Sequence, residues 1–418
     1  MASFIVYGGE GLHGDIFIQG SKNASLPILA ATLLHCGVTR IYGCPDITDI
    51  RQMLRILEYL GCRIERGANY IEIDAKAAAY SPVHEEDACQ MRSSLFLMGA
   101  LLGRFGEVLL PYPGGCAIGK RPIDIHLEAL RQMNVSLVED EHGIYGYTKT
   151  LTGTVLNLRY PSVGATQNII LAAVKADGKT VIMNAAKEPE IVELCLMLNK
   201  MGADIHGMGT ARVTIYGVSH LHDTSFTMTA DRIVASTYLA AAAITCGNVR
   251  VMNVWEHDIK SVLQVLAQMG CGIVVQSKRI RVIGPQMLFA VEEIHTRPFP
   301  GFPTDMQSQI LACLSVAYGD SCIYEHIFEN RFRIVPELKK MGADIRLQQQ
   351  CAQVHGVKAL HAGRVTAMDL RGGAGLVLAA LAAEGKTCID GAEFIRRGYE
   401  NICADLNMLG ASVEEVQE

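Results

Sequence analysis

A motif that occurs six times constrains the fold of this chain more than any other feature. It reads Leu-x-x-(Met/Leu)-(Gly/Asn)-x-x-aliphatic, and successive copies start 73, 68, 68, 72 and 68 residues apart. The copies begin at Leu57, Leu130, Leu198, Leu266, Leu338 and Leu406. The glycine, which is asparagine in the second copy, stands where a left-handed residue ends a helix before a strand. The spacing therefore predicts six structural units of about 70 residues.

A second element recurs about twenty residues before each copy of the motif. It is a helical stretch rich in Ala and Leu that ends at a glycine and leads into a strand. The glycines are Gly37, Gly106, Gly178, Gly247, Gly319 and Gly385. These helices are apolar on nearly all sides, as in the stretch 238–244, so they are expected inside a domain. The helix that carries the motif is amphipathic, and each unit is predicted to read helix, strand, helix, strand, strand.

The unit length and the apolar helices together decide the fold class. Units of this size are too long for an open solenoid, and their order does not suit a Rossmann sheet. Helices that are apolar on all sides need sheets around them. We therefore predict an α+β fold: a two-domain inside-out α/β barrel built from six βαβαββ-type repeats, three per domain, with buried helices and outer sheets. The boundary is expected near Thr229, and the strands at 4–7 and 16–18 could pair with either domain.

Composition excludes several classes of protein. Half of the 418 residues are hydrophobic, 19% are charged and the net charge is −6, so no bulk electrostatic attraction to nucleic acid or to a membrane surface is expected. The thirteen cysteines are scattered without a CxxC pair or a His/Cys cluster at zinc spacing. We expect a reducing compartment, no metal and no cofactor. The absence of a signal peptide or a spanning apolar run favours a cytoplasmic protein.

The stretch 113–126 holds the most unusual local sequence. Three glycines surround Cys116, and Lys120 and Arg121 precede Pro122, a residue that suits the first turn of a helix. A thiol beside cations in such a loop is more acidic and more reactive than a buried one. The stretch therefore indicates either a reactive cysteine beside an anion site or an ordinary surface turn with an incidental cysteine.

Charged residues stand at several of the predicted helix starts. The apolar helices are predicted to begin near Lys22-Asn23, Arg92, Gly164-Ala165, Asp231-Arg232, Thr304-Asp305 and Arg371. Cations are unfavourable at helix N-termini, so Lys22, Arg92 and Arg371 indicate either a functional site or solvated surface positions.

Three further residues complete the predicted site. Arg331 and Arg397 are expected at the starts of amphipathic helices, and the cations together favour an anion site for phosphate and carboxylate groups. Asp305 could cap its helix or act as a general base towards a substrate hydroxyl.

The motifs of this chain resemble, in order and over its whole length, those of the enolpyruvyl transferases. The matching stretches are 21–24, 113–119, 121–124, 162–166, 188–190, 302–305, 329–331 and 369–371. Within that family the chain is similar to the branch that uses UDP-N-acetylglucosamine, because the branch that makes enolpyruvylshikimate phosphate lacks the Gly-Gly-Cys loop. The resemblance implies transfer of the enolpyruvyl group of phosphoenolpyruvate to the 3′-hydroxyl of the sugar nucleotide. Phosphate is released in this step, the first committed one of peptidoglycan precursor synthesis.

The resemblance also implies roles for single residues. Lys22, Arg121 and Arg397 would hold the phosphate of phosphoenolpyruvate, and Arg331 and Arg371 would lie near its carboxylate. The sugar nucleotide would contact Asn23, Arg92, Arg121, Pro122, Ile123, Asp124, Ile125, Ser162, Val163, Gly164, Asp305 and Ile327. Cys116 would donate a proton to the methylene carbon and can carry a covalent adduct, and Asp305 would take the hydroxyl proton.

The resemblance implies a domain arrangement as well. Residues 22–229 would form the domain that carries the cysteine loop, residues 1–21 and 230–418 the second domain, and the active site would lie in the cleft between them. Two alternatives stay open. One is a paralogue of the same fold with another hydroxyl acceptor, and the other is a regulator that binds the sugar nucleotide without catalysis.

Overall fold

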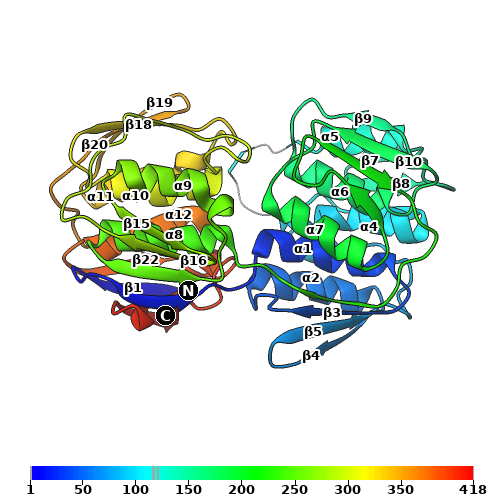
Figure 1. Cartoon of the computed structure of the whole chain (residues 1–418), viewed down its shortest axis with the longest axis horizontal. Coiled ribbons are helices and arrows are strands. Elements are labelled where there is room, and N and C mark those ends of the chain that lie inside the picture. The colour runs from blue at the N-terminus through cyan, green and yellow to red at the C-terminus, as the bar shows by residue number, and fades with distance from the viewer. Residues whose placement is uncertain (1, 115–117, 120–121, 418) are drawn as a thin grey trace. The chain divides into compact units, whose positions relative to one another are not determined.

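The computed structural model describes residues 2–114, 118–119 and 122–417 (Figure 1). The described residues separate into two compact units. Unit 1 contains residues 2–19, 118–119 and 230–417, and unit 2 contains residues 20–114 and 122–229. Each unit has its own hydrophobic core.

Unit 2 is built from helices that are enclosed by sheets (Figure 1). Its helices are α1 (Lys22–Ala31), η1 (Thr32–Leu34), α2 (Thr48–Tyr59), α3 (Glu85–Ala88), η2 (Arg92–Leu95), α4 (Phe96–Phe105), α5 (Asp124–Gln132), α6 (Val163–Ala173) and α7 (Pro189–Lys200). Its strands are β3 (Val38–Tyr42), β4 (Arg63–Arg66), β5 (Tyr70–Asp74), β6 (Glu107–Leu110), β7 (Ser136–Asp140), β8 (Gly143–Tyr147), β9 (Val155–Asn157), β10 (Lys179–Met183), β11 (Asp204–His206), β12 (Arg212–Tyr216) and β13 (Thr224–Thr227). The strands form sheets in the orders β13-β3-β5-β4, β6-β8-β7 and β11-β12-β10-β9.

Unit 1 repeats this plan. Its helices are α8 (Arg232–Ile244), α9 (Glu256–Gln268), η3 (Thr304–Met306), α10 (Gln307–Leu314), η4 (Arg331–Ile334), α11 (Val335–Lys340), α12 (Leu370–Ala382), α13 (Ala392–Ile395) and α14 (Ile402–Met408). Its strands are β1 (Ala2–Gly8), β2 (His13–Phe17), β14 (Asn248–Met252), β15 (Gly272–Gln276), β16 (Arg279–Ile283), β17 (Glu293–His295), β18 (Asp320–Tyr324), β19 (Asp344–Gln348), β20 (Cys351–His355), β21 (Arg364–Thr366), β22 (Gly385–Asp390) and β23 (Ser412–Gln417). The sheets run β21-β22-β1-β23, β15-β16-β14-β2 and β17-β18-β20-β19.

The two N-terminal strands both belong to the sheets of unit 1. Strand β1 pairs antiparallel with β22 and β23, which lie at the other end of the chain, and β2 pairs parallel with β14. In unit 2 the late strand β13 pairs parallel with β3 in the same way. Strands β2 and β13 therefore each add a parallel edge strand to their sheet, whereas β1 lies inside its sheet.

The predicted helix ends in the repeated motif are confirmed. All six motif positions adopt positive φ, from 69° at Asn134 to 101° at Gly202. The other four are Gly61, Gly270, Gly342 and Gly410. Glycine suits this backbone region because it lacks a Cβ, and asparagine is among the few other residues that tolerate it.

The apolar helices are also buried as predicted. Helices α1, α4 and α6 pack together in unit 2, and α8, α10 and α12 pack together in unit 1. As predicted, the glycine that follows each of these helices leads into a strand. Four of the six have positive φ, whereas Gly37 and Gly247 do not. After α8 the left-handed residue is Cys246, at φ 52°, while a Cβ at Gly247 would lie 2.3 Å from the Leu12 carbonyl oxygen. Gly247 therefore serves close backbone approach.

Among the described residues, no helix is long and apolar enough to cross a membrane.

Candidate active site

Asp305 lies between two buried arginines of unit 1. It is the middle residue of η3, which leads directly into the apolar helix α10. Arg331 donates from Nη2 to Asp305 Oδ1 at 2.8 Å, and Arg371 donates from Nη2 to Oδ2 at 3.2 Å. The arginine side chains are only 3% and 4% exposed, whereas Asp305 is 27% exposed. The Asp305 carboxylate thus bonds to both buried guanidiniums, while part of its side chain stays exposed to solvent.

These contacts set the charge state of the cluster. Burial raises the pKa of Asp305, but Arg371 and Arg331 outweigh that effect and hold the pKa well below its ordinary value. Burial also lowers the pKa of Arg371, and Asp305 more than compensates, so the pKa is raised. Asp305 and Arg371 are therefore both charged at neutral pH. Of the two alternatives for Asp305, the helix cap finds no support, because the start of neither η3 nor α10 has a side-chain cap.

Arg371 has unused hydrogen-bonding capacity. Its Nη1 is buried and has no hydrogen-bond partner among the described residues. A buried guanidinium N–H without an acceptor costs free energy, and such groups in native proteins usually await a water, an ion or a ligand. The alternative of a solvated surface cation is wrong for Arg371 and for Lys22, which are 4% and 8% exposed.

Two other predicted residues of unit 1 lie near these elements in sequence. Ile327 follows β18, and its backbone N–H donates to the carboxylate of buried Glu325 at 2.8 Å. Arg331 begins η4, which continues into α11, as expected. Arg397 was expected at a helix start, and that prediction is wrong: it lies in a turn between α13 and α14. Helix α13 ends at Ile395, two residues before Arg397, and α14 begins only at Ile402.

Lys22 forms the corresponding ion pair of unit 2. It starts α1, where Ser21 Oγ caps the helix by accepting from Ala24 N at 3.3 Å. Its Nζ lies 2.8 Å from Oδ2 of Asp49, in the first turn of α2, and both side chains are at most 10% exposed. Asp49 therefore neutralises a cation that the helix dipole of α1 would otherwise disfavour. Asn23, the next residue, is half-buried.

The remaining described candidates of unit 2 lie on α5, α6 and η2. Asp124 starts α5 and pairs with Arg159. His126, two residues on, packs against Gly164, where a Cβ would lie 3.1 Å from the imidazole ring. The 122–125 and 162–164 stretches are thereby held close together. Ser162 caps α6 through a bond from Ala165 N at 3.3 Å.

The remaining predicted site residues either stand at partly or fully exposed positions or lie outside the described part of the chain. The described members Pro122, Ile123, Ile125, Val163 and Arg92 are half-buried or exposed. Cys116 and Arg121 lie outside the described residues.

Three residues that were not among the predicted site residues join these clusters. Asp49 pairs with Lys22, Arg232 contributes to the field at Asp305, and Glu325 accepts four hydrogen bonds beneath the 327–328 turn. Arg232 had a signal, because it stands at a predicted helix start. Asp49 and Glu325 had no such signal, because an acidic residue within a helix or just after a strand is common at exposed positions of any protein.

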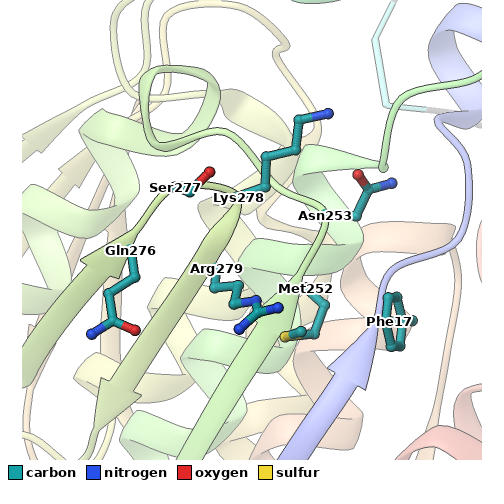
Figure 2. A pocket seen from close by; sticks show the side chains of 7 residues that line it. All are labelled: Phe17, Met252, Asn253, Gln276, Ser277, Lys278 and Arg279. Atoms are coloured by element: carbon teal, nitrogen blue, oxygen red, sulfur yellow. The ribbon is translucent and has the colours of Figure 1, made fainter.

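An open pocket elsewhere on unit 1 contains none of these residues. It encloses about 650 Å³ at the ends of β2, β14 and the β15–β16 hairpin (Figure 2). Its lining consists of Phe17, Met252, Asn253, Gln276, Ser277, Lys278 and Arg279. Phe17 is 78% exposed, so this is a shallow surface feature. Among the described residues, no group of His, Cys, Asp and Glu has the arrangement of a metal site.

Comparison with known proteins identifies the family. A family model described as EPSP synthase (3-phosphoshikimate 1-carboxyvinyltransferase) matches residues 6–406. UDP-N-acetylglucosamine 1-carboxyvinyltransferase 2 of Caldanaerobacter subterraneus subsp. tengcongensis is 44% identical over 100% of both chains. UDP-N-acetylglucosamine 1-carboxyvinyltransferase 1 of Symbiobacterium thermophilum is also 44% identical, over 99% of this chain and 95% of its own.

Solved structures show the same two-domain inside-out fold. The enolpyruvyl transferase NikO from Streptomyces tendae superposes with a TM-score of 0.89 at 23% identity, covering 100% of this chain and 99% of its own. EPSP synthase from Acinetobacter baumannii gives 0.77 at 19% identity, with full coverage of both chains. The predicted fold class is thus confirmed. Because the family model and the relatives span almost the entire sequence, the chain belongs to the EPSP synthase family of enolpyruvyl (carboxyvinyl) transferases.

Proposed function

We propose that this protein transfers the enolpyruvyl group of phosphoenolpyruvate to the 3′-hydroxyl of UDP-N-acetylglucosamine and releases phosphate. The observation that carries the proposal is the Asp305 cluster. It offers a carboxylate for a hydroxyl proton and, on two buried guanidiniums, positive charge for an anionic co-substrate. The choice of acceptor is supported by the names of the relatives that are 44% identical over nearly the whole chain.

The cations are proposed to bind phosphoenolpyruvate. Lys22, Arg121 and Arg397 hold its phosphate, and Arg331 and Arg371 lie at its carboxylate. The partnerless Nη1 of Arg371 supports this assignment, because a carboxylate oxygen would satisfy it. Asp49 keeps the Lys22 ammonium in place through the 2.8 Å ion pair.

The acceptor is proposed to bind a second set of residues. Its contacts are Asn23, Arg92, Arg121, Pro122, Ile123, Asp124, Ile125, Ser162, Val163, Gly164, Asp305 and Ile327. The packing of His126 on Gly164 supports a shared site for the 122–125 and 162–164 stretches, because it brings the two within one small region of unit 2.

The chemistry is an addition followed by an elimination. The acceptor oxygen bonds to C2 of phosphoenolpyruvate as its proton passes to Asp305, and Cys116 protonates the methylene carbon C3. Loss of a proton from C3 and of phosphate from C2 then restores the double bond. An acid and a base on opposite sides of the reacting carbons are what such an addition needs.

The two arginine contacts make Asp305 a weak base as the structure stands, because its pKa is held low. We infer that the anionic groups of phosphoenolpyruvate share the guanidinium N–H groups, which returns basicity to the carboxylate. Asp305 then becomes a stronger base only when phosphoenolpyruvate is bound, so the acceptor hydroxyl is deprotonated only when the co-substrate is in place.

The test is phosphate release from phosphoenolpyruvate, with and without UDP-N-acetylglucosamine, on the wild type and on Asp305→Asn. Asparagine keeps the shape and one acceptor oxygen but cannot take a proton at neutral pH. We expect release that requires the sugar nucleotide and falls by at least about 100-fold in the variant. Release without an acceptor, or unchanged release by the variant, contradicts the proposal.

Two competing functions have distinct signatures. A paralogue with another acceptor would release phosphate in the presence of that acceptor. One example is shikimate 3-phosphate, the acceptor named in the description of the matching family model. A regulator binds the sugar nucleotide without turnover; retention of the acidic and basic groups Cys116 and Asp305 disfavours it. As a peptidoglycan precursor enzyme, the protein is proposed to act in the cytoplasm.

A further inference from the structure

Glu325 is a buried carboxylate that connects two parts of the proposed acceptor site. It follows β18 and is 1% exposed. Its Oε2 accepts from Thr304 Oγ1 at 2.9 Å. Its Oε1 accepts from Thr296 Oγ1 at 2.9 Å, from Ile327 N at 2.8 Å and from Phe328 N at 3.2 Å. One side chain therefore joins the loop after β17, the helical turn η3 and the 327–328 turn.

The segments that it joins carry two residues of the proposed chemistry. Thr304 immediately precedes Asp305, the proposed base, and Ile327 is a proposed acceptor contact. A further link runs through Arg331, whose Nε donates to the Thr304 carbonyl at 3.2 Å and whose Nη2 holds Asp305. The Thr296 hydroxyl in turn accepts from His326 N at 2.9 Å, so the bonds form a connected network.

We propose that Glu325 is a positioning residue that fixes the distance between the base Asp305 and the acceptor contact at Ile327. This inference rests on the proposed function. A carboxylate with four donors on two oxygens is nearly saturated, so it holds its partners in one arrangement. Displacement of a reacting group by about 1 Å can cost on the order of 100-fold in rate. Glu325 itself contacts no reacting atom in this account.

Glu337 provides a matched control in the same unit. It is a buried carboxylate, 3% exposed, that accepts from Lys340 Nζ at 2.8 Å and from Thr366 N at 2.9 Å. Neither partner belongs to the proposed site. A leucine at either position removes the same charge and acceptors at similar volume, so general loss of stability affects both variants while loss of positioning affects one.

The kinetic test compares Glu325→Leu, Glu325→Gln and Glu337→Leu. Glu325→Leu is expected to lower kcat/KM for UDP-N-acetylglucosamine by about 100-fold while KM for phosphoenolpyruvate stays near the wild-type value. Glu325→Gln is expected to recover most of this loss, since its oxygen can accept three bonds and its amide can donate to the Thr304 hydroxyl. Glu337→Leu is expected to leave the kinetics unchanged. Wild-type kinetics of folded Glu325→Leu, or a KM for phosphoenolpyruvate that rises as much as the KM for UDP-N-acetylglucosamine, overturns the proposal.

Thr304→Val covers the case in which Glu325→Leu does not fold. It is close to isosteric and removes only the bond between Glu325 and η3. We expect a fall in kcat of about tenfold, corresponding to partial misplacement of the base. Unchanged kcat in this variant contradicts the positioning role.

Amide hydrogen exchange separates this inference from the proposed function. Exchange at Ile327 and Phe328 is expected to be faster in Glu325→Leu than in Glu337→Leu, and faster than in Glu325→Gln, whose oxygen still accepts from both amides. That readout needs no turnover, so it tests the network even if the wild type releases no phosphate with UDP-N-acetylglucosamine. Equal exchange in the variants overturns the proposal by itself.

Discussion

Removal of the Asp305 carboxylate is expected to destabilise unit 1, although Asp305 is itself partly exposed. Asp305→Ala leaves Arg331 and Arg371 buried beside one another without the charge that now bonds to both, at 2.8 and 3.2 Å. Breaking a buried ion pair by removing one partner costs about 3–5 kcal/mol. The Asp305 side chain is 27% exposed, so water can reach the arginines from that side. We therefore expect a loss at the lower end of this range, about 3 kcal/mol.

Calorimetric thermal unfolding measures this effect. For a unit of about 200 residues, 1 kcal/mol corresponds to roughly 2–4 °C, so the unit 1 transition of Asp305→Ala is expected roughly 6–12 °C below that of the wild type. Inorganic phosphate at millimolar concentration is expected to raise the midpoint of the variant more than that of the wild type, because an anion can occupy the vacated position. An unchanged midpoint would refute the account of Asp305 as the counter-charge of the cluster.

The pH dependence follows from the lowered pKa of Asp305. A carboxyl with a depressed pKa contributes stability above its unfolded value, about 3.9, and loses that contribution as the pH falls through the folded value. The difference between wild type and Asp305→Ala should therefore stay constant between about pH 5 and 8 and shrink only below about pH 4. A difference that disappears by pH 6 contradicts the assignment.

Three further predictions concern the loop, the helix packing and the helix ends. Cys116→Ser should abolish labelling by an epoxide electrophile at neutral pH, and persistent labelling within the loop would exclude Cys116 as the nucleophile. Gly99→Ala places a Cβ 2.3 Å from the Asn168 carbonyl oxygen and should destabilise unit 2 by about 2 kcal/mol or more in urea unfolding, while Gly103→Ala on the same helix, which meets a movable side chain first, should cost less. Asn134→Ala should lose roughly 1–2 kcal/mol, because alanine is strained at φ 69° and cannot donate to the Thr150 carbonyl; Asn134→Gly loses the same hydrogen bond but adopts this φ without strain, so it should lose less.

Local signals were enough to predict the architecture. Each left-handed helix end is fixed by one residue and its neighbours, so six copies of the motif located six such ends. The burial of these helices could also be predicted, because a helix that is apolar on all sides must lie inside a domain. Local signals could not show why a glycine stands at position 247. There it is required by the close approach of Leu12, a neighbour distant in sequence, and not by a left-handed backbone.

The candidate site was only partly predictable, because its contacts are non-local. The cations could be picked out where they conflict with a helix dipole, as Lys22 and Arg371 do. Their partners could not: Asp49 lies on the next helix, and Glu325 gathers donors from three segments. The two interpretations of Asp305, a helix cap or a base, differ in which groups contact its carboxylate. The sequence does not show that two arginines do so, because both are distant from Asp305 in the chain.

Product analysis tests the central claim most directly. The protein is incubated with phosphoenolpyruvate and equal amounts of UDP-N-acetylglucosamine and shikimate 3-phosphate, and products are followed by proton NMR and mass spectrometry with phosphate measured in parallel. We predict vinylic methylene signals on the sugar nucleotide alone, at the 3′-oxygen, with one phosphate released per product. Transfer to shikimate 3-phosphate, or phosphate release with both acceptors unchanged, would contradict the proposed function.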